Sequence, residues 1–94
     1  MNLQFEWDDE KDRANRKKHG ISFETASYVF RDEYFIEMYD FEHSIDEDRY
    51  IAIGMVGDLL FVVFTERSDA IRLISARLAT ESERRLYYDQ NFYN

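Results

Sequence analysis

Two apolar segments near the middle of the chain constrain its fold more than any other feature. Residues 49–56 (RYIAIGMV) and 59–65 (LLFVVFT) are apolar at successive positions, which is typical of strands that are buried on both faces. Only Gly57-Asp58 separates them, and a glycine in the first position of so short a connection favours a type II′ turn. We therefore predict an antiparallel hairpin at the centre of a sheet.

The rest of the chain supplies further strands and three helices. Short alternating or apolar runs predict strands at residues 3–7, 34–39 and 70–77. Helices are expected at residues 8–19, 23–31 and 81–90. The order β-α-α-β-β-β-β-α, with short loops between successive strands, predicts an α+β fold: an antiparallel sheet with two N-terminal helices and one C-terminal helix. Residues 1–94 suit a single domain with one modest core.

The first predicted helix is polar on all sides, with a single alanine as its apolar residue. Asp8 is suited to cap its N-terminus, and Gly20 to end it in a left-handed conformation. Such a helix either packs weakly or exposes a functional face. Lys11, Asn15 and Lys18 lie at i, i+4 and i+7 and therefore share one face. We expect that face to lie toward the arginines of the sheet or toward a protein partner.

Capping signals also mark the other two helices. Ser22 precedes the second helix, whose apolar residues follow helical spacing and predict a buried stripe: Phe23, Ala26, Val29 and Phe30. Thr80 and Glu83 have the spacing of a capping box, which predicts the start of the last helix.

The charge of the chain is unevenly distributed. A net charge of −8 would by itself argue against nucleic acid, but residues 32–48 hold eight acids and no lysine or arginine. The remaining residues are neutral overall, with bases clustered at 11–18 and again beyond residue 66. This distribution allows a polyanion on one face and a basic partner on another; the alternative is that these charges are solvated surface.

Composition excludes several classes of protein. The chain has no cysteine, which excludes disulfides and thiolate metal sites and fits a reducing compartment. It has no signal-peptide pattern and no apolar run of membrane-spanning length, so we expect a cytoplasmic protein without membrane contact. The motifs of P-loop enzymes, dinucleotide-binding enzymes, zinc proteases, serine hydrolases and EF-hands are absent.

Four arginines of the second half suggest a phosphate site on the sheet. Planar guanidinium groups bind phosphate through two parallel hydrogen bonds, and several on one surface would form a cradle. The residues in question are Arg49, Arg67, Arg72 and Arg77. The alternative is that each arginine pairs with an acid, of which Glu66, Asp69 and Glu83 are nearby in sequence. Strict alternation along residues 70–77 places Arg72 with Ile74 and Ala76 on one face, and Arg77 with Ile71, Leu73 and Ser75 on the other.

Two further groups of residues offer chemistry. His19, beside Lys18, is a candidate proton carrier, although a histidine at a helix C-terminus also simply complements the helix dipole. The acidic segment offers oxygen and nitrogen ligands for a hard cation, but their spacing matches no known loop: Asp40, Glu42, His43, Asp46 and Glu47.

Three blocks of the sequence, in this order, form a distinctive pattern. The first is Trp7-Asp8-x-x-Lys11-x-x-x-Asn15-x-x-Lys18-His19-Gly20-x-x-Phe23-x-x-Ala26. The second is Asp40-x-x-His43-Ser44 followed by Arg49-x-x-x-x-Gly54. The third is Ile71-Arg72-Leu73-Ile74-Ser75-Ala76-Arg77-x-Ala79-x-x-x-Glu83-Arg84-x-x-Tyr87. Together these blocks resemble the BrnT family of type II toxins. The resemblance implies a RelE-like fold and a metal-independent endoribonuclease that needs no cofactor and inhibits translation. It also implies a BrnA-type ribbon-helix-helix antitoxin, in a hetero-oligomer that reaches DNA only through the antitoxin.

The matched positions give candidate site residues. The catalytic candidates are Lys18, His19, Arg49, Arg72, Arg77 and Glu83, and the candidates for binding RNA or phosphate are Lys11, Asn15, Arg67 and Tyr87. Cleavage needs a proton carrier, for which His19, a lysine or Glu83 all qualify, and fixed positive charge to stabilise the phosphorane. Alternatively, Glu83 only caps its helix and Tyr87 is a core aromatic.

The acidic segment at residues 32–48 leaves other functions open. It is unfavourable for RNA nearby, so it either binds a basic surface of the antitoxin or confines RNA to the opposite face. A catalytically weak or inactive protein-binding module that modulates DNA binding is therefore the main alternative. A metal-dependent hydrolase is the third.

Overall fold

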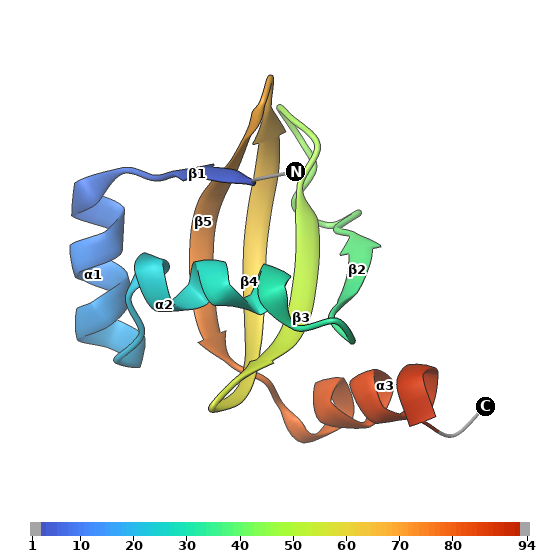
Figure 1. Ribbon diagram of the computed structural model, residues 1–94. Coiled ribbons are helices and arrows are strands. Elements are labelled where there is room, and N and C mark those ends of the chain that lie inside the picture. Colours follow the sequence, from blue (N-terminus) through green and yellow to red (C-terminus); the bar gives the residue numbers. More distant parts are fainter. Residues whose placement is uncertain (1–2, 93–94) are drawn as a thin grey trace.

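The structure, a computed structural model, describes residues 3–92 as one five-stranded sheet with helices on both faces and at one edge (Figure 1). The elements are β1 (Gln4–Glu6), α1 (Asp9–His19), α2 (Phe23–Ser27), the 3₁₀ helix η1 (Tyr28–Arg31), β2 (Ile36–Tyr39), β3 (Tyr50–Val56), β4 (Asp58–Arg67), β5 (Ala70–Leu78) and α3 (Glu81–Phe92). The α+β class is confirmed. Within the described residues, no helix has the length and apolarity needed to cross a membrane.

The sheet is mixed, and the prediction of a purely antiparallel sheet is wrong at one edge. The strand order is β1-β5-β4-β3-β2, in which β2 to β5 form an antiparallel meander. In contrast, β1 runs parallel to β5, with Gln4 opposite Ala70 and Glu6 opposite Arg72. Neighbouring strands joined by short loops must be antiparallel, but β1 meets a strand that is distant in the chain. Its direction is therefore set by tertiary packing.

The two tight turns of the meander depend on left-handed residues. Between β3 and β4 the register pairs Val56 with Asp58, so Gly57 alone makes the connection, with φ of 73°. The connection is shorter than the predicted two-residue turn, and glycine tolerates its positive φ without strain. Between β4 and β5, Ser68 adopts φ of 51° in a turn of two residues.

A β-bulge in β5 overturns the predicted division of that strand into two faces. Val63 of β4 lies opposite Ser75, but the next residue, Phe64, lies opposite Leu73, so Ile74 is the extra residue of a bulge. The bulge moves Arg72 to the face of Ser75 and Arg77. It also places Leu73 with Ala76 in the main core.

The helix pair α2–η1 covers one face of the sheet (Figure 1). Phe23, Ala26 and Val29 are fully buried, as the helical stripe predicts, and Phe30 is partly buried against the same core. The predicted single helix is divided into an α-helix and a 3₁₀ turn. A Cβ on Gly54 of β3 would lie 2.8 Å from Cγ1 of Val29 and 3.0 Å from its carbonyl oxygen, so the absence of a side chain lets η1 approach the sheet.

The opposite face is covered by α3 at one end only. Tyr87 of α3 is buried against Ile53 and Leu59, and its hydroxyl donates a 2.6 Å hydrogen bond to Oδ2 of Asp32. Burial alone would raise the pKa of Asp32, but hydrogen bonds from Tyr87 and from the Tyr34 and Met55 amides outweigh it and hold the pKa below its ordinary value. The remainder of this face, toward the loop at residues 40–48, is left open.

Hydrogen bonds, rather than apolar contacts, anchor the polar helix α1 beside β5 (Figure 1). The caps are as predicted: Asp8 Oδ1 accepts from the amide of Glu10 at 2.8 Å, and Gly20 adopts φ of 73°. Asn15, the buried residue of the helix at 8% exposure, donates from Nδ2 to the carbonyls of Ile21 and Ala76 at 2.9 Å each. Its Oδ1 accepts from the Ala76 amide at 3.1 Å. The side-chain amide of Asn15 therefore fixes α1 against β5, a role that apolar residues usually have in a surface helix.

Candidate active site

A groove of ≈620 Å³ crosses the open face of the sheet between the loop at residues 40–48 and α3. Its floor is apolar and is formed by strand residues that include Ile51, Phe61 and Val63. Its polar lining residues are His43 of the loop, Ser75 and Arg77 of β5, and Glu83 of α3, together with Asp40 and Glu42. A shallow apolar groove with a few polar groups is the usual setting of a binding or catalytic site.

A carboxylate–imidazole pair lies at the loop side of this groove. Nδ1 of His43 lies 2.9 Å from Oδ2 of Asp40, and the Asp40 side chain is only 9% exposed whereas that of His43 is 63% exposed. The loop is fixed by Ser44, whose hydroxyl donates to the Asp40 carbonyl at 2.6 Å and accepts from the Arg49 amide at 2.8 Å. Asp40 therefore orients a ring whose other nitrogen is free to exchange a proton with a substrate.

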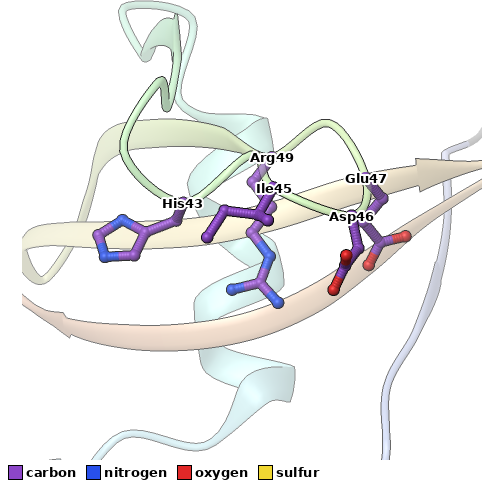
Figure 2. A pocket seen from close by; sticks show the side chains of 5 residues that line it. All are labelled: His43, Ile45, Asp46, Glu47 and Arg49. Atoms are coloured by element: carbon purple, nitrogen blue, oxygen red, sulfur yellow. The ribbon is translucent and has the colours of Figure 1, made fainter.

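Arg49 provides an unpaired positive charge beside this histidine. A pocket of ≈220 Å³ is lined by His43, Ile45, Asp46, Glu47 and Arg49, and Figure 2 shows the guanidinium between His43 and the two acids. Across residues 3–92, no hydrogen bond or ion pair engages this guanidinium. Glu47 instead binds Nη2 of Arg67 at 3.0 Å. A half-buried, unpaired guanidinium is well suited to bind a phosphate.

Arg77 and Glu83 form a second polar cluster in the groove. Nη1 and Nη2 of Arg77 donate to the two carboxylate oxygens of Glu83 at 2.8 and 2.9 Å, while the guanidinium lies 3.9 Å from the centroid of the Phe61 ring. Glu83 Oε1 also accepts from the Thr80 amide at 2.8 Å, which confirms the capping box. Burial alone would raise the pKa of Glu83, but the hydrogen bond from Arg77 and the bonds from Thr80 hold it below its ordinary value. Glu83 is therefore ionised and fully engaged, which makes it a poor proton donor.

The four arginines do not form the single phosphate cradle that the sequence suggests. Arg72 donates to Glu6 Oε2 at 2.7 Å, and Arg67 pairs with Glu47, so neither takes part in lining the groove. The alternative of pairing with acids is correct for Arg67, Arg72 and Arg77. The partners Glu6 and Glu47 are distant in sequence, which is why proximity along the chain did not reveal them.

Two residues predicted to bind RNA serve the fold instead. The side chain of Asn15 is buried with all three of its hydrogen bonds to backbone groups. Tyr87 is 3% exposed in the core beneath α3, which confirms the alternative that it is a core aromatic. Neither side chain is accessible to a substrate.

The other residues of the α1 face do line a groove. Lys11, Lys18 and His19 surround a groove of ≈250 Å³ between α1 and β5, together with Ile74 and Ser75. All three basic residues are exposed. Ser75 also lines the larger groove, so the basic end of α1 continues the open face of the sheet. Asn15 fixes the centre of this helix face against β5, whereas Lys11 and Lys18 are exposed at its two ends. That the face lies toward the sheet arginines or a protein partner stays a prediction.

His43 is not among the proton carriers that the sequence suggests. Asp40 and His43 enter the sequence analysis as possible metal ligands and as part of the second family block, whereas in the structure their spacing of three residues in a turn brings a carboxylate onto an imidazole. Across residues 3–92, no three histidine, aspartate or glutamate side chains are arranged to hold a metal ion together. The Asp-x-x-His spacing, followed by a serine that closes the loop, was the available signal.

Comparisons with known proteins give two findings. The sequence profile of the family described as the ribonuclease toxin BrnT of type II toxin-antitoxin systems matches residues 7–83. The crystal structure of the Brucella abortus ribonuclease toxin BrnT superposes with a TM-score of 0.62 at 25% sequence identity, over 85% of this chain and 100% of that chain. Comparison with curated protein sequences gives no match.

Proposed function

The chain belongs to the BrnT family of ribonuclease toxins of type II toxin-antitoxin systems, and from this premise we propose that it cleaves RNA in the groove beside the loop at residues 40–48. The observation that carries the proposal is the arrangement of Asp40, His43 and Arg49. It combines an oriented imidazole with a guanidinium that no acid engages. These are the two groups that RNA cleavage without a metal ion requires.

The chemistry follows from these groups. His43 takes the proton of a ribose 2′-hydroxyl, whose oxygen then bonds to the adjacent phosphorus. The bond from phosphorus to the 5′-oxygen breaks, and water protonates that oxygen. The protonated His43 returns its proton to the hydroxide that remains, and the products are a 2′,3′-cyclic phosphate and a 5′-hydroxyl end. Arg49 stabilises the extra negative charge of the phosphorane, which such fixed donors do without reorganisation. Asp40 acts as a positioning residue.

Arg77 and the basic end of α1 support binding rather than proton transfer. Arg77 is held rigid by Glu83 and Phe61 at the floor of the groove, where its remaining donor capacity is available to a phosphate. Lys11, Lys18 and His19 bind the phosphates of the neighbouring nucleotides. RNA thus enters from the α1 side and meets the acidic loop only at His43 and Arg49.

The finer features implied by the family belong to the same proposal. The fold is RelE-like, the partner is a BrnA-type antitoxin in a hetero-oligomer that contacts DNA through the antitoxin, and the protein acts in the cytoplasm without a metal or another cofactor. The family assignment supports an antitoxin partner and an RNA substrate for this chain.

Cleavage of a single-stranded RNA by the protein made in a cell-free system tests the proposal. With EDTA present, the wild-type chain is expected to cleave, and H43A to lose activity by about 10²–10⁴-fold, the usual contribution of a general base. The matched control H19A removes the other histidine, which takes part in binding but not in proton transfer, so its cleavage rate at saturating RNA is expected to stay within a few-fold of wild type. Equal activity of H43A and wild type, or activity that EDTA abolishes, would overturn the proposal.

The same assay separates the main alternative. If the wild-type chain leaves RNA intact under all conditions but still binds its antitoxin, the chain is a protein-binding module. The acidic surface beside the groove is the observation that favours this alternative.

A further inference from the structure

The loop at residues 40–48 exposes two large apolar side chains, one on each side of His43. Phe41 and Ile45 are each 84% exposed, the largest exposed fractions among the big apolar side chains of the described residues. The Phe41 ring packs edge-on against Tyr39 at a centroid distance of 4.7 Å, which holds it at the rim of the groove. Single exposed apolar residues are common, but two beside a reactive histidine form a small patch suited to a partner.

The same loop carries negative charge that the fold leaves unpaired. Residues 40–48 include five acids and no lysine or arginine. Three of these acids are engaged: Asp40 by His43, Glu47 by Arg67, and Asp48 by the Tyr39 hydroxyl at 2.8 Å. Glu42 and Asp46 form no ion pair or side-chain hydrogen bond within residues 3–92. They lie next in sequence to Phe41 and Ile45.

The patch is held in place by the loop rather than being loosely tethered. Ser44, at its centre, bonds to the backbone of Asp40 and of Arg49, and the Asp40 amide donates to the Arg49 carbonyl at 2.9 Å. The two ends of the loop are therefore clamped together. A preformed surface loses little conformational entropy when a partner binds, which favours affinity.

We propose that Phe41, Glu42, Ile45 and Asp46 form the docking surface for a basic, amphipathic segment of the antitoxin, which covers His43 and Arg49 when it binds. This inference rests on the proposed function, because the family supplies the antitoxin and the groove supplies what it blocks. The apolar side chains of the segment contact Phe41 and Ile45, and its lysines or arginines pair with Glu42 and Asp46. Inhibition then follows from exclusion of RNA from the groove.

The negative charges of the loop favour a basic protein segment as the occupant of this surface, over RNA and over a second copy of this chain. Phosphate groups of RNA are repelled by the unpaired acids of the loop, so RNA does not explain the patch. A second copy of this chain carries the same net charge of −8 and the same acidic loop, so self-association here would bring like charges together. A basic segment of a protein satisfies both the apolar and the acidic components of the surface.

The test measures binding of the purified cognate antitoxin to the full chain by calorimetry, at low and at high salt. F41S/I45S is expected to weaken binding by at least about 10-fold, because large apolar side chains at the centre of an interface dominate its affinity. E42Q/D46N is expected to weaken binding several-fold at low salt and less at high salt, because salt screens surface charges.

Two matched controls locate the effect. L78S removes another apolar side chain that is 54% exposed, at the opposite end of the sheet, and E10Q/E24Q makes the same change of net charge on α1 and α2. Both are expected to bind as the wild type does. The altered side chains are all exposed, so circular dichroism and urea unfolding are expected to show unchanged folding.

The outcomes are distinguishable from failure of the proposed function, because binding is measured whether or not the chain cleaves RNA. F41S/I45S that binds antitoxin within two-fold of wild type overturns the proposal. F41S/I45S that loses RNA cleavage while antitoxin binding is unchanged also overturns it, and assigns the patch to RNA. Retained cleavage that the antitoxin no longer suppresses supports it.

Discussion

Helix α1 and the loop at residues 40–48 reverse the roles that a helix and a loop usually have in a small domain. The helix has an almost wholly polar surface and docks on β5 through the side-chain amide of Asn15. The loop is rich in acids, so its composition predicts a solvated segment, yet it exposes the large apolar side chains of Phe41 and Ile45. Polar hydrogen bonding builds the fold in one region, and apolar surface is left for a partner in the other.

The two regions also give the ends of the open face opposite charge. Lys11 and Lys18 lie at the α1 end, and Glu42 and Asp46 at the loop end, with His43 and Ser75 lining the groove between them. RNA and a basic antitoxin segment are therefore expected to approach the same groove from different sides. Substitutions at the two ends are therefore expected to affect different properties of the protein.

After His43, replacing Arg49 should have the largest effect on activity. We expect R49A to lower the rate of RNA cleavage by about 10²–10³-fold, comparable to the loss of one donor that stabilises a transition state. Its stability should be unchanged, because the guanidinium has no partner to lose. R84A, which removes an arginine paired with Asp58 instead, is the control in single-turnover assays. Cleavage by R49A within three-fold of wild type would contradict the assigned role.

Replacing Asn15 should detach the basic end from the sheet. N15A leaves the amide and carbonyl of Ala76 without a partner next to α1, so we expect a loss of about 1–3 kcal/mol in the free energy of unfolding, the cost of an unsatisfied buried group. Urea denaturation measures this. Asn91, which donates to the Tyr34 and Tyr87 carbonyls nearer the surface, gives the control N91A with a smaller expected loss. Equal losses for the two variants would show that Asn15 is not a special anchor.

Removing two lysines should weaken RNA binding without affecting the chemistry. For K11Q/K18Q we expect the affinity for single-stranded RNA to fall several-fold, and the slope of log K against log salt to decrease by about 1.4, since each phosphate contact contributes about 0.7. R13Q/K17Q removes the same charge from other positions of α1 and is expected to leave the slope nearly unchanged. A slope that changes equally for both pairs would argue against a defined RNA path along α1.

The smallest effect concerns Glu83 and pH. The folded-state pKa of Glu83 lies below its ordinary value, so its interactions stabilise the fold above that ordinary value and are lost as the pH falls through the lower folded-state pKa. The unfolding free energy of E83Q should therefore depend less on pH than that of wild type, at and below the ordinary pKa of a glutamate. E81Q, at an exposed acid without an ion pair in the described part of the chain, is the control. Identical pH dependence of E83Q and wild type would show that the pair with Arg77 has no net effect on stability.

The parts of the fold that the sequence predicted correctly are local. Asp8 and Gly20 cap α1 through contacts within four residues, Thr80 and Glu83 do the same for α3, and the stripe at residues 23–29 follows helical spacing. The central hairpin required only two apolar segments and a short turn. Each of these features depends on residues that are close together in the chain, so the sequence alone is enough to predict them.

The parts that were wrong depend on partners far along the chain or on one added residue. Arg72 pairs with Glu6 across 66 positions, and Arg67 with Glu47 across 20, so no local sequence pattern predicts either contact. The bulge at Ile74 transfers Arg72 to the other face, because a shift of one residue in a strand exchanges its faces. The RNA-binding role expected for Asn15 failed for the same reason, since its partner Ala76 is 61 positions away.

The sequence is enough to establish the class of fold, the caps, the buried stripe of α2–η1, the family and the concentration of acid in one segment. The folded structure was needed to reveal the parallel pairing of β1 with β5, the engagement of three arginines by acids, and the pocket that His43 and Arg49 share. The physical reason is one of range. Backbone capping and hydrophobic spacing act over a few residues, whereas a site depends on which distant side chains the folded sheet brings within hydrogen-bonding distance.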